Sequence, residues 1–115
     1  MQSPKGHTVS VPEIDVEILA GLQAAGAVII DVREVDEYED GHVAGAVLIP
    51  LGEVTERVAE VPTDSPVYVI CKSGGRSARA AEWLITQGID ATNVAGGTMA
   101  WIDAGRSVVL GGEPT

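Results

Sequence analysis

The chain has only one cysteine, Cys71, among its 115 residues. A single cysteine cannot form an internal disulfide, which is typical of proteins in reducing compartments, and it leaves no resolving thiol. Residues 1–7 lack the apolar stretch of a signal peptide. No apolar run approaches the ~20 residues that span a membrane. We therefore expect a cytoplasmic protein without a membrane partner.

Basic residues are also scarce. The 7 Lys and Arg residues face 17 Asp and Glu residues, which gives a formal net charge of −10. This balance makes nucleic acid a poor partner. Yet three of the seven basic residues, Lys72, Arg76 and Arg79, lie between positions 72 and 79. A locally positive segment on a negative protein favours a small anionic substrate.

The rest of the chain alternates strand and helix patterns, in a length that suits one domain. Short apolar runs predict strands at 27–33, 47–49, 67–70 and 92–94, and Pro12 confines a further strand at 10–14 to a sheet edge. Helices are expected at 16–25, at 77–85 and around 99–102, with short helical pieces at 36–40 and 53–60, and an irregular segment from 106 to 115. This alternation predicts an α/β fold with a parallel sheet covered on both faces.

Cys71 follows the short β-branched and aromatic strand at 67–70, and Ser77 is the expected cap of the next helix. The cysteine thus lies at the carboxyl end of a strand, where parallel sheets bind ligands. The N-terminus of the following helix favours an anion there. Gly74 and Gly75 allow successive N–H groups to converge into an anion-binding nest. With basic side chains nearby, we expect a thiol of low pKa that acts as a nucleophile.

Several segments in their order and spacing resemble the single-domain rhodaneses, a family of sulfurtransferases. The matching segments are 30–34, 38–46, 49–50, the loop from Cys71 to Ser77 with its helix, and 94–101. The resemblance implies a single domain over residues 10–107, with an N-terminal extension at 1–9 and a tail at 108–115. It also implies a five-stranded parallel sheet flanked by helices on both faces.

The resemblance further implies ping-pong transfer of sulfane sulfur through a persulfide on Cys71, with no cofactor. Backbone N–H groups of the loop would cradle that persulfide, and the side chains of Lys72 and Arg76 would face an anionic donor such as thiosulfate. Cyanide, a thiol or a protein would accept the sulfur. The residues assigned to substrate binding are Lys72, Ser73, Gly74, Gly75, Arg76 and Ser77.

Two other functions stay open. Cysteine phosphatases use a wider Cys-x5-Arg loop, and a phosphatase or arsenate reductase on this fold is disfavoured because Arg76 follows Cys71 at Cys-x4-Arg. A non-catalytic rhodanese-like module that binds partners or senses redox state is the second alternative. Such modules commonly lose the cysteine or the loop charge, and both are present in this chain.

A few polar and aromatic residues outside the loop need an interpretation. His7 and His42 lack ligand spacing to each other or to Cys71, so no metal site is expected. We expect His42 to shape its loop by hydrogen bonding. Asp31 and Arg33 are expected to form a structural salt bridge or to fix a turn. Trp101 fits the core and the mouth of the pocket equally well.

Overall fold

The computed structural model describes residues 9–115. The expected N-terminal extension, except for its last residue, and His7 lie outside the described residues. Within residues 9–115, no helix has the length and apolar character needed to cross a membrane.

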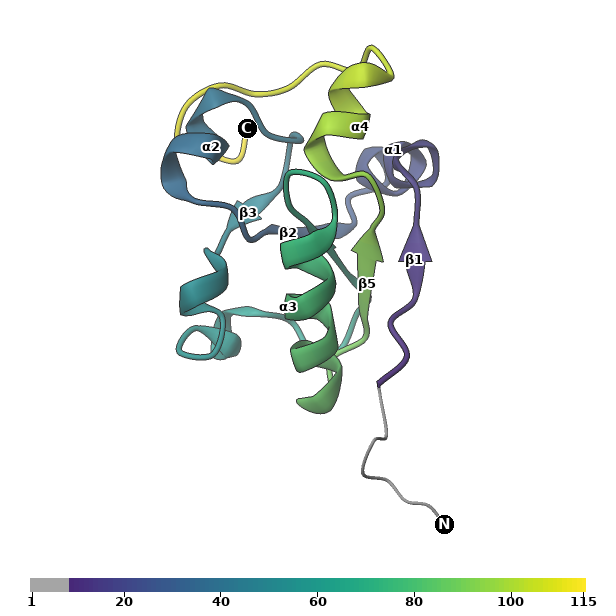
Figure 1. The fold of residues 1–115 in the computed structure, drawn as a ribbon, viewed down its shortest axis with the longest axis vertical. Helices are drawn as coiled ribbons and strands as arrows, with labels where there is room; N and C mark the ends of the chain where they lie inside the picture. Colours follow the sequence, from purple (N-terminus) through teal and green to yellow (C-terminus); the bar gives the residue numbers. More distant parts are fainter. Residues whose placement is uncertain (1–8) are drawn as a thin grey trace.

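Five parallel strands form the central sheet (Figure 1). In chain order they are β1 (Glu13–Ile14), β2 (Val28–Asp31), β3 (Val47–Leu48), β4 (Val67–Ile70) and β5 (Ala91–Val94). Their order across the sheet is β1-β5-β4-β2-β3, so β4 occupies the centre and β1 is an edge strand. The predicted α/β fold and parallel sheet are confirmed.

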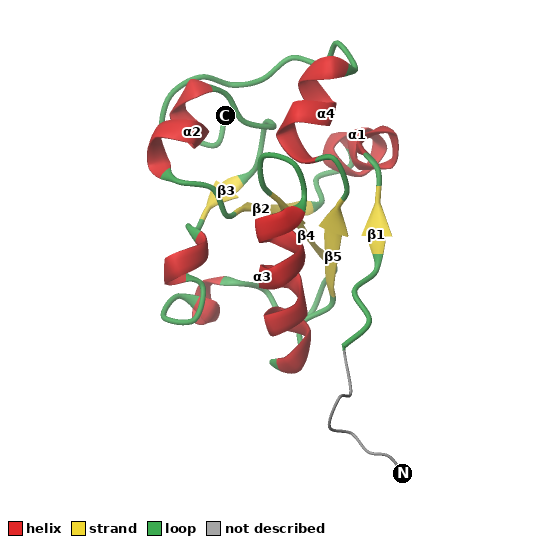
Figure 2. Ribbon diagram, viewed as in Figure 1, coloured by secondary structure: helices red, strands yellow, loops and turns green. Residues whose placement is uncertain are grey.

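Helices cover both faces of this sheet (Figure 2). The α-helices are α1 (Val16–Ala24), α2 (Val35–Asp40), α3 (Gly75–Thr86) and α4 (Gly97–Asp103). The helix expected at 53–60 is instead two short 3-10 helices, η1 (Leu51–Glu53) and η2 (Val58–Glu60). Helix α3 and the 3-10 helices pack on one face, and α1, α2 and α4 contribute to the core on the other.

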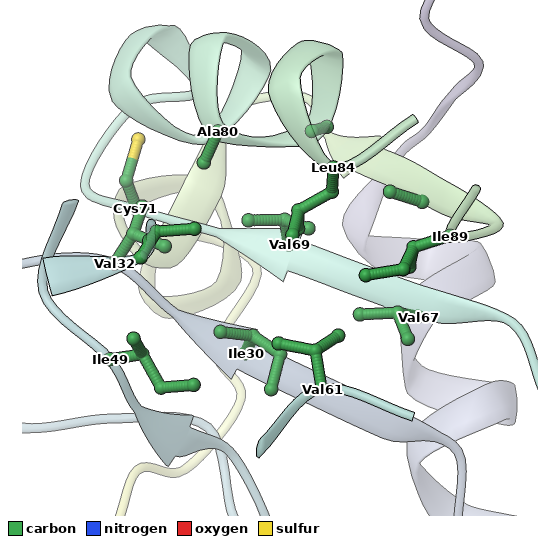
Figure 3. Close-up of a cluster of buried hydrophobic side chains, with 13 residues drawn as sticks. Ile30, Val32, Ile49, Val61, Val67, Val69, Cys71, Ala80, Leu84 and Ile89 are labelled. Carbon is green, nitrogen blue, oxygen red and sulfur yellow. The ribbon is translucent and has the colours of Figure 1, made fainter. Parts of the chain in front are cut away.

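The side chains of β4 alternate between two hydrophobic cores. Val67 and Val69 belong to the cluster that α3 covers, together with Cys71 just beyond the strand (Figure 3). Ile70 belongs to the opposite cluster, with residues of α1, α2 and α4. Because successive side chains of a strand point to opposite faces, this alternation directs the Cys71 side chain toward α3.

The C-terminal segment after α4 has no helix or strand, as expected, but it is held against the domain. An isolated antiparallel bridge joins His42 to Val109. The N–H of Gly45 donates to the carbonyl of Pro114 at 3.0 Å, and the N–H of Gly111 donates to that of Glu39 at 2.9 Å. The segment therefore covers the loop that follows α2.

Candidate active site

Cys71 lies directly after the central strand β4, and its sulfur points toward the first turn of α3 (Figure 3). The residue is only 1% exposed. The loop from Lys72 to Gly74 connects the strand to the helix. The sulfur therefore lies at the base of a small cradle formed by the chain that follows it.

Hydrogen-bond donors surround the Cys71 sulfur. The N–H of Gly74 donates to Sγ at 3.1 Å, and the Ser77 hydroxyl lies 3.3 Å from it. Burial alone would raise the pKa of this thiol. Hydrogen bonds from the Ser77 hydroxyl and from the N–H groups of Ser77, Gly74 and Ser73 oppose that effect, and the pKa lies below its ordinary value. The site thus favours a thiolate.

The loop folds this way because Gly74 has a φ of +110° and serves as the N-cap of α3. Such a φ favours glycine, which has no Cβ to clash. The prediction that Ser77 caps the helix is wrong, because α3 begins two residues earlier, at Gly75. Ser77 instead lies within the first turn, fully buried, with its hydroxyl directed at Cys71 and Asn93.

Helix α4 supports the loop from behind. The N–H of Thr98 donates to the carbonyl of Cys71 at 2.9 Å, and that of Met99 donates to the carbonyl of Lys72 at 3.0 Å. In a trans peptide, C=O and the next N–H point in opposite directions. The N–H groups of Lys72 and Ser73 therefore point away from α4. Gly97 makes the close approach possible, because a Cβ there would lie 2.5 Å from both carbonyl oxygens.

Arg76 is not a free cation in this structure. Its guanidinium donates to both carboxylate oxygens of Glu37 on α2, at 2.8 and 3.0 Å. Hydrogen bonding to Arg76 holds the pKa of Glu37 at about 2, against the opposing effect of partial burial. Local sequence does not indicate Glu37 as the partner of Arg76, because it lies 39 positions away in an acidic segment typical of a solvated surface.

Lys72 is the exposed cation of the loop. It lines a hollow of about 220 Å³ together with side chains from α2 and α4, among them Glu37, Thr98 and Met99. Arg79 is also exposed, but it lines a different hollow, between α3 and the segment at 51–55. The three basic residues therefore do not converge on one point.

Asp31 and Arg33 form a buried ion pair, as expected. The guanidinium donates to Asp31 at 2.9 to 3.2 Å and to the carbonyl of Gly41 at 2.9 Å. His42 is also buried, with its ring nitrogens 2.8 Å from the carbonyl oxygens of Tyr38 and Glu113. These contacts fix the loop after α2, as expected for the three side chains. Arg33 also lines the hollow beside Lys72.

Trp101 belongs to the core rather than to the pocket mouth. It is 5% exposed, and its indole N–H donates to the carbonyl of Ser107 at 2.9 Å. Among the described residues, no three His, Cys, Asp or Glu side chains cluster in a way that could hold a metal ion.

Comparison with known proteins identifies the family. Residues 15–104 match the Rhodanese-like domain. The chain belongs to the rhodanese-like domain family. A rhodanese-related protein from Thermoplasma volcanium has the same fold, with a TM-score of 0.82 and 34% identity, over 86% of this chain and 98% of that one.

Two relatives of this rhodanese-like domain have names that concern sulfur. Thiosulfate sulfurtransferase GlpE of Pseudomonas entomophila is 33% identical over 76% of this chain and 82% of its own length. YrkF of Bacillus subtilis, a proposed sulfur carrier, is 41% identical over 80% of this chain. The chain spans about half the length of YrkF, 51%.

Proposed function

We propose that the protein is a thiosulfate sulfurtransferase that carries sulfane sulfur as a persulfide on Cys71. The supporting observation is the Cys71 sulfur itself, held by the Gly74 N–H and beside the Ser77 hydroxyl at the head of α3. A thiol pKa below the ordinary value supplies the thiolate that attacks sulfur. The thiosulfate sulfurtransferase name of one relative supports the same substrate.

The reaction has two balanced half-steps. In the first, the Cys71 thiolate attacks the outer sulfur of thiosulfate, a Cys–S–S bond forms, and sulfite leaves with the electron pair of the broken S–S bond. In the second, cyanide or a thiolate takes the outer sulfur, and the Cys71 thiolate is restored. No external oxidant or reductant is needed.

The loop residues have separate roles in this scheme. The N–H groups from Lys72 to Ser77 stabilise the negative charge of the persulfide by electrostatic attraction. The exposed Lys72 attracts the sulfonate end of the donor. Arg76 attracts the anionic donor less strongly than its formal charge suggests, because the Glu37 carboxylate already balances that charge. The single cysteine favours the reducing cytoplasm as the compartment and leaves resolution of the persulfide to an external acceptor.

The competing activity is phosphate-ester hydrolysis, which this loop should not support. A phosphoryl group in the transition state has three equatorial oxygens that need stabilisation. Loss of one such donor typically costs ~10²–10³ in rate, and the Cys-x4-Arg loop has one peptide unit fewer than the phosphatase loop.

The test is the ratio of kcat/KM for thiosulfate, with cyanide as acceptor, to kcat/KM for an aryl phosphate in the same preparation. We expect rapid thiocyanate formation and negligible phosphatase activity. A ratio in favour of the phosphate would contradict the proposal. Insertion of one residue between Gly75 and Arg76 should damage sulfur transfer.

A further inference from the structure

Behind the Cys71 cradle lies a chain of three polar side chains, two buried and one exposed, that the sulfurtransferase reaction does not require. It runs from the Ser77 hydroxyl through Asn93 on β5 to Glu13 on the edge strand β1. Ser77 and Asn93 are at most 1% exposed. Buried polar side chains beneath a reactive cysteine need a reason.

The orientation of the Asn93 amide is fixed by its neighbours. One nitrogen, Nδ2, lies 2.8 Å from a carboxylate oxygen of Glu13 and 3.2 Å from the carbonyl oxygen of Gly74. Both of those atoms only accept hydrogen bonds, so the NH2 group must face them. The amide oxygen therefore faces the Ser77 hydroxyl, at 2.6 Å.

The Ser77 hydroxyl has two acceptors but one hydrogen. The Asn93 oxygen lies 2.6 Å away, and the Cys71 sulfur lies 3.3 Å away. Because an amide oxygen has no hydrogen to give, the short contact requires Ser77 to be the donor. When Cys71 is a thiol, its S–H can then donate to the Ser77 oxygen, and every group is satisfied.

The arrangement changes when the thiol loses its proton to solvent. A thiolate can only accept, so the Ser77 hydrogen must turn from Asn93 to the sulfur or leave the thiolate without this donor. In the first case the buried amide oxygen of Asn93 loses its partner, and an unsatisfied buried acceptor is costly. Glu13, exposed at the sheet edge, accepts from the NH2 end of Asn93 and keeps the amide oxygen directed at Ser77.

We propose that Asn93 is a positioning residue that competes with the Cys71 sulfur for the hydroxyl hydrogen of Ser77. The thiolate is consequently less stabilised than its cradle would allow. In the persulfide, the negative charge moves to the outer sulfur, and the Ser77 hydrogen can return to Asn93. The chain of polar groups thus favours the sulfur-loaded state over the empty thiolate. This inference rests on the proposed persulfide chemistry for its function, but not for its test.

The test is the pH dependence of alkylation of Cys71 by iodoacetamide, followed by intact mass. Cys71 is the only cysteine, so the half-point of the rate against pH reports its thiol pKa alone. Replacement of Asn93 by leucine, Asn93→Leu, preserves approximate size and removes the competing oxygen. We expect the half-point to move to lower pH by roughly half to one unit, the equivalent of one net hydrogen bond.

A merely structural role for Asn93 predicts a shift of the alkylation half-point in the opposite direction. If the asparagine only shaped the loop, its loss would disturb the N–H donors and move the half-point to higher pH. An unchanged or higher half-point therefore overturns the proposal. Asn93→Val, with a β-branched side chain suited to a strand, is the second substitution if leucine prevents folding.

The matched control is the same change in a Ser77→Ala background. Without the hydroxyl there is nothing to compete for, so Asn93→Leu should leave the half-point of Ser77→Ala unchanged. A shift that persists in this background would contradict the proposal. Alkylation needs no sulfur donor, whereas the proposed function is tested by sulfur transfer. A failure of the Asn93 proposal and a failure of the proposed function are therefore seen in different measurements.

Discussion

Arg76 and Glu37 form a two-point ion pair across the mouth of the site, with N–O distances of 2.8 and 3.0 Å. The pair joins the first turn of α3 to α2, which the chain places far apart in sequence. The arginine next to the thiolate is therefore balanced by a carboxylate. An anionic donor that approaches Lys72 also approaches Glu37, because both line the same hollow.

The first prediction concerns the charge of Glu37. Glu37→Gln keeps an acceptor for the Glu34 N–H in the capping box of α2. It removes a negative charge near the donor and frees the charge of Arg76. We expect the KM for thiosulfate to fall about two- to fivefold, the range for a partly exposed pair, with little change in kcat.

The matched control for this change is Glu39→Gln, which removes an exposed carboxylate from the same helix. It should leave the KM for thiosulfate nearly unchanged. Steady-state kinetics at low ionic strength gives both values. An unchanged or higher KM in Glu37→Gln would show that the pair does not weaken donor binding.

The same pair predicts a pH dependence of stability. The Arg76 guanidinium lowers the pKa of Glu37 from 4.5 to about 2. A lowered folded-state pKa stabilises the protein above pH 4.5, and this contribution is lost as the pH falls toward 2. Over that interval, the free energy of unfolding should fall more steeply in the unmodified protein than in Glu37→Gln. Urea unfolding at several pH values measures the difference. The same pH dependence of the free energy of unfolding in both proteins would contradict a stabilising contribution from the pair.

Lys72 should affect the binding of the donor and not the stability of the fold. Lys72→Ala should raise the KM for thiosulfate several-fold, while the free energy of unfolding changes by only about ±0.5 kcal/mol, as for other exposed side chains. Arg79→Ala is the control, since Arg79 is an exposed cation of the same segment that lines another hollow. Equal effects of the two substitutions on KM would mean that only the overall charge counts.

Gly97 should be the most sensitive glycine behind the site. Its φ is +60°, and a Cβ would lie 2.5 Å from the carbonyl oxygens of Cys71 and Lys72. Gly97→Ala should therefore lower both stability and sulfur transfer. Gly105→Ala is the control, because Gly105 has a φ of +82° with no atom within 4 Å of its Cβ position. Gly105→Ala should lower the free energy of unfolding by only about 1–2 kcal/mol, because alanine is strained in left-handed backbone. Its sulfur-transfer activity should be retained.

Measurement of urea unfolding and of thiocyanate formation separates these two effects of Gly97. A Gly97→Ala protein as stable and as active as Gly105→Ala would show that the contact between α4 and the loop is not needed.

Much of this architecture could be predicted from local sequence. The apolar run before Cys71 and the glycines after it are neighbours in the chain, so their strand, turn and helix follow from short-range preferences. Asp31 and Arg33 are two residues apart at a strand end, and their pairing is confirmed. The order and spacing of the matching segments indicate the family, which the match over residues 15–104 confirms.

The parts that could not be predicted depend on contacts between distant segments. Glu37 meets Arg76 only after α2 packs beside the loop. Asn93 and Glu13 are 80 positions apart and meet because β1 pairs with β5. The start of α3 at Gly75 could not be predicted because Ser77 is a common N-cap residue. Gly74 caps the helix instead, and the Ser77 hydroxyl contacts Cys71 and Asn93.

The persulfide on Cys71 is the central claim, and intact mass after brief mixing with thiosulfate tests it most directly. The unmodified protein should gain the mass of one sulfur atom, and cyanide should remove it with release of thiocyanate. Cys71→Ser, which is nearly isosteric and should fold normally, should gain nothing. No added sulfur on the unmodified protein, or the same addition on Cys71→Ser, would contradict the account.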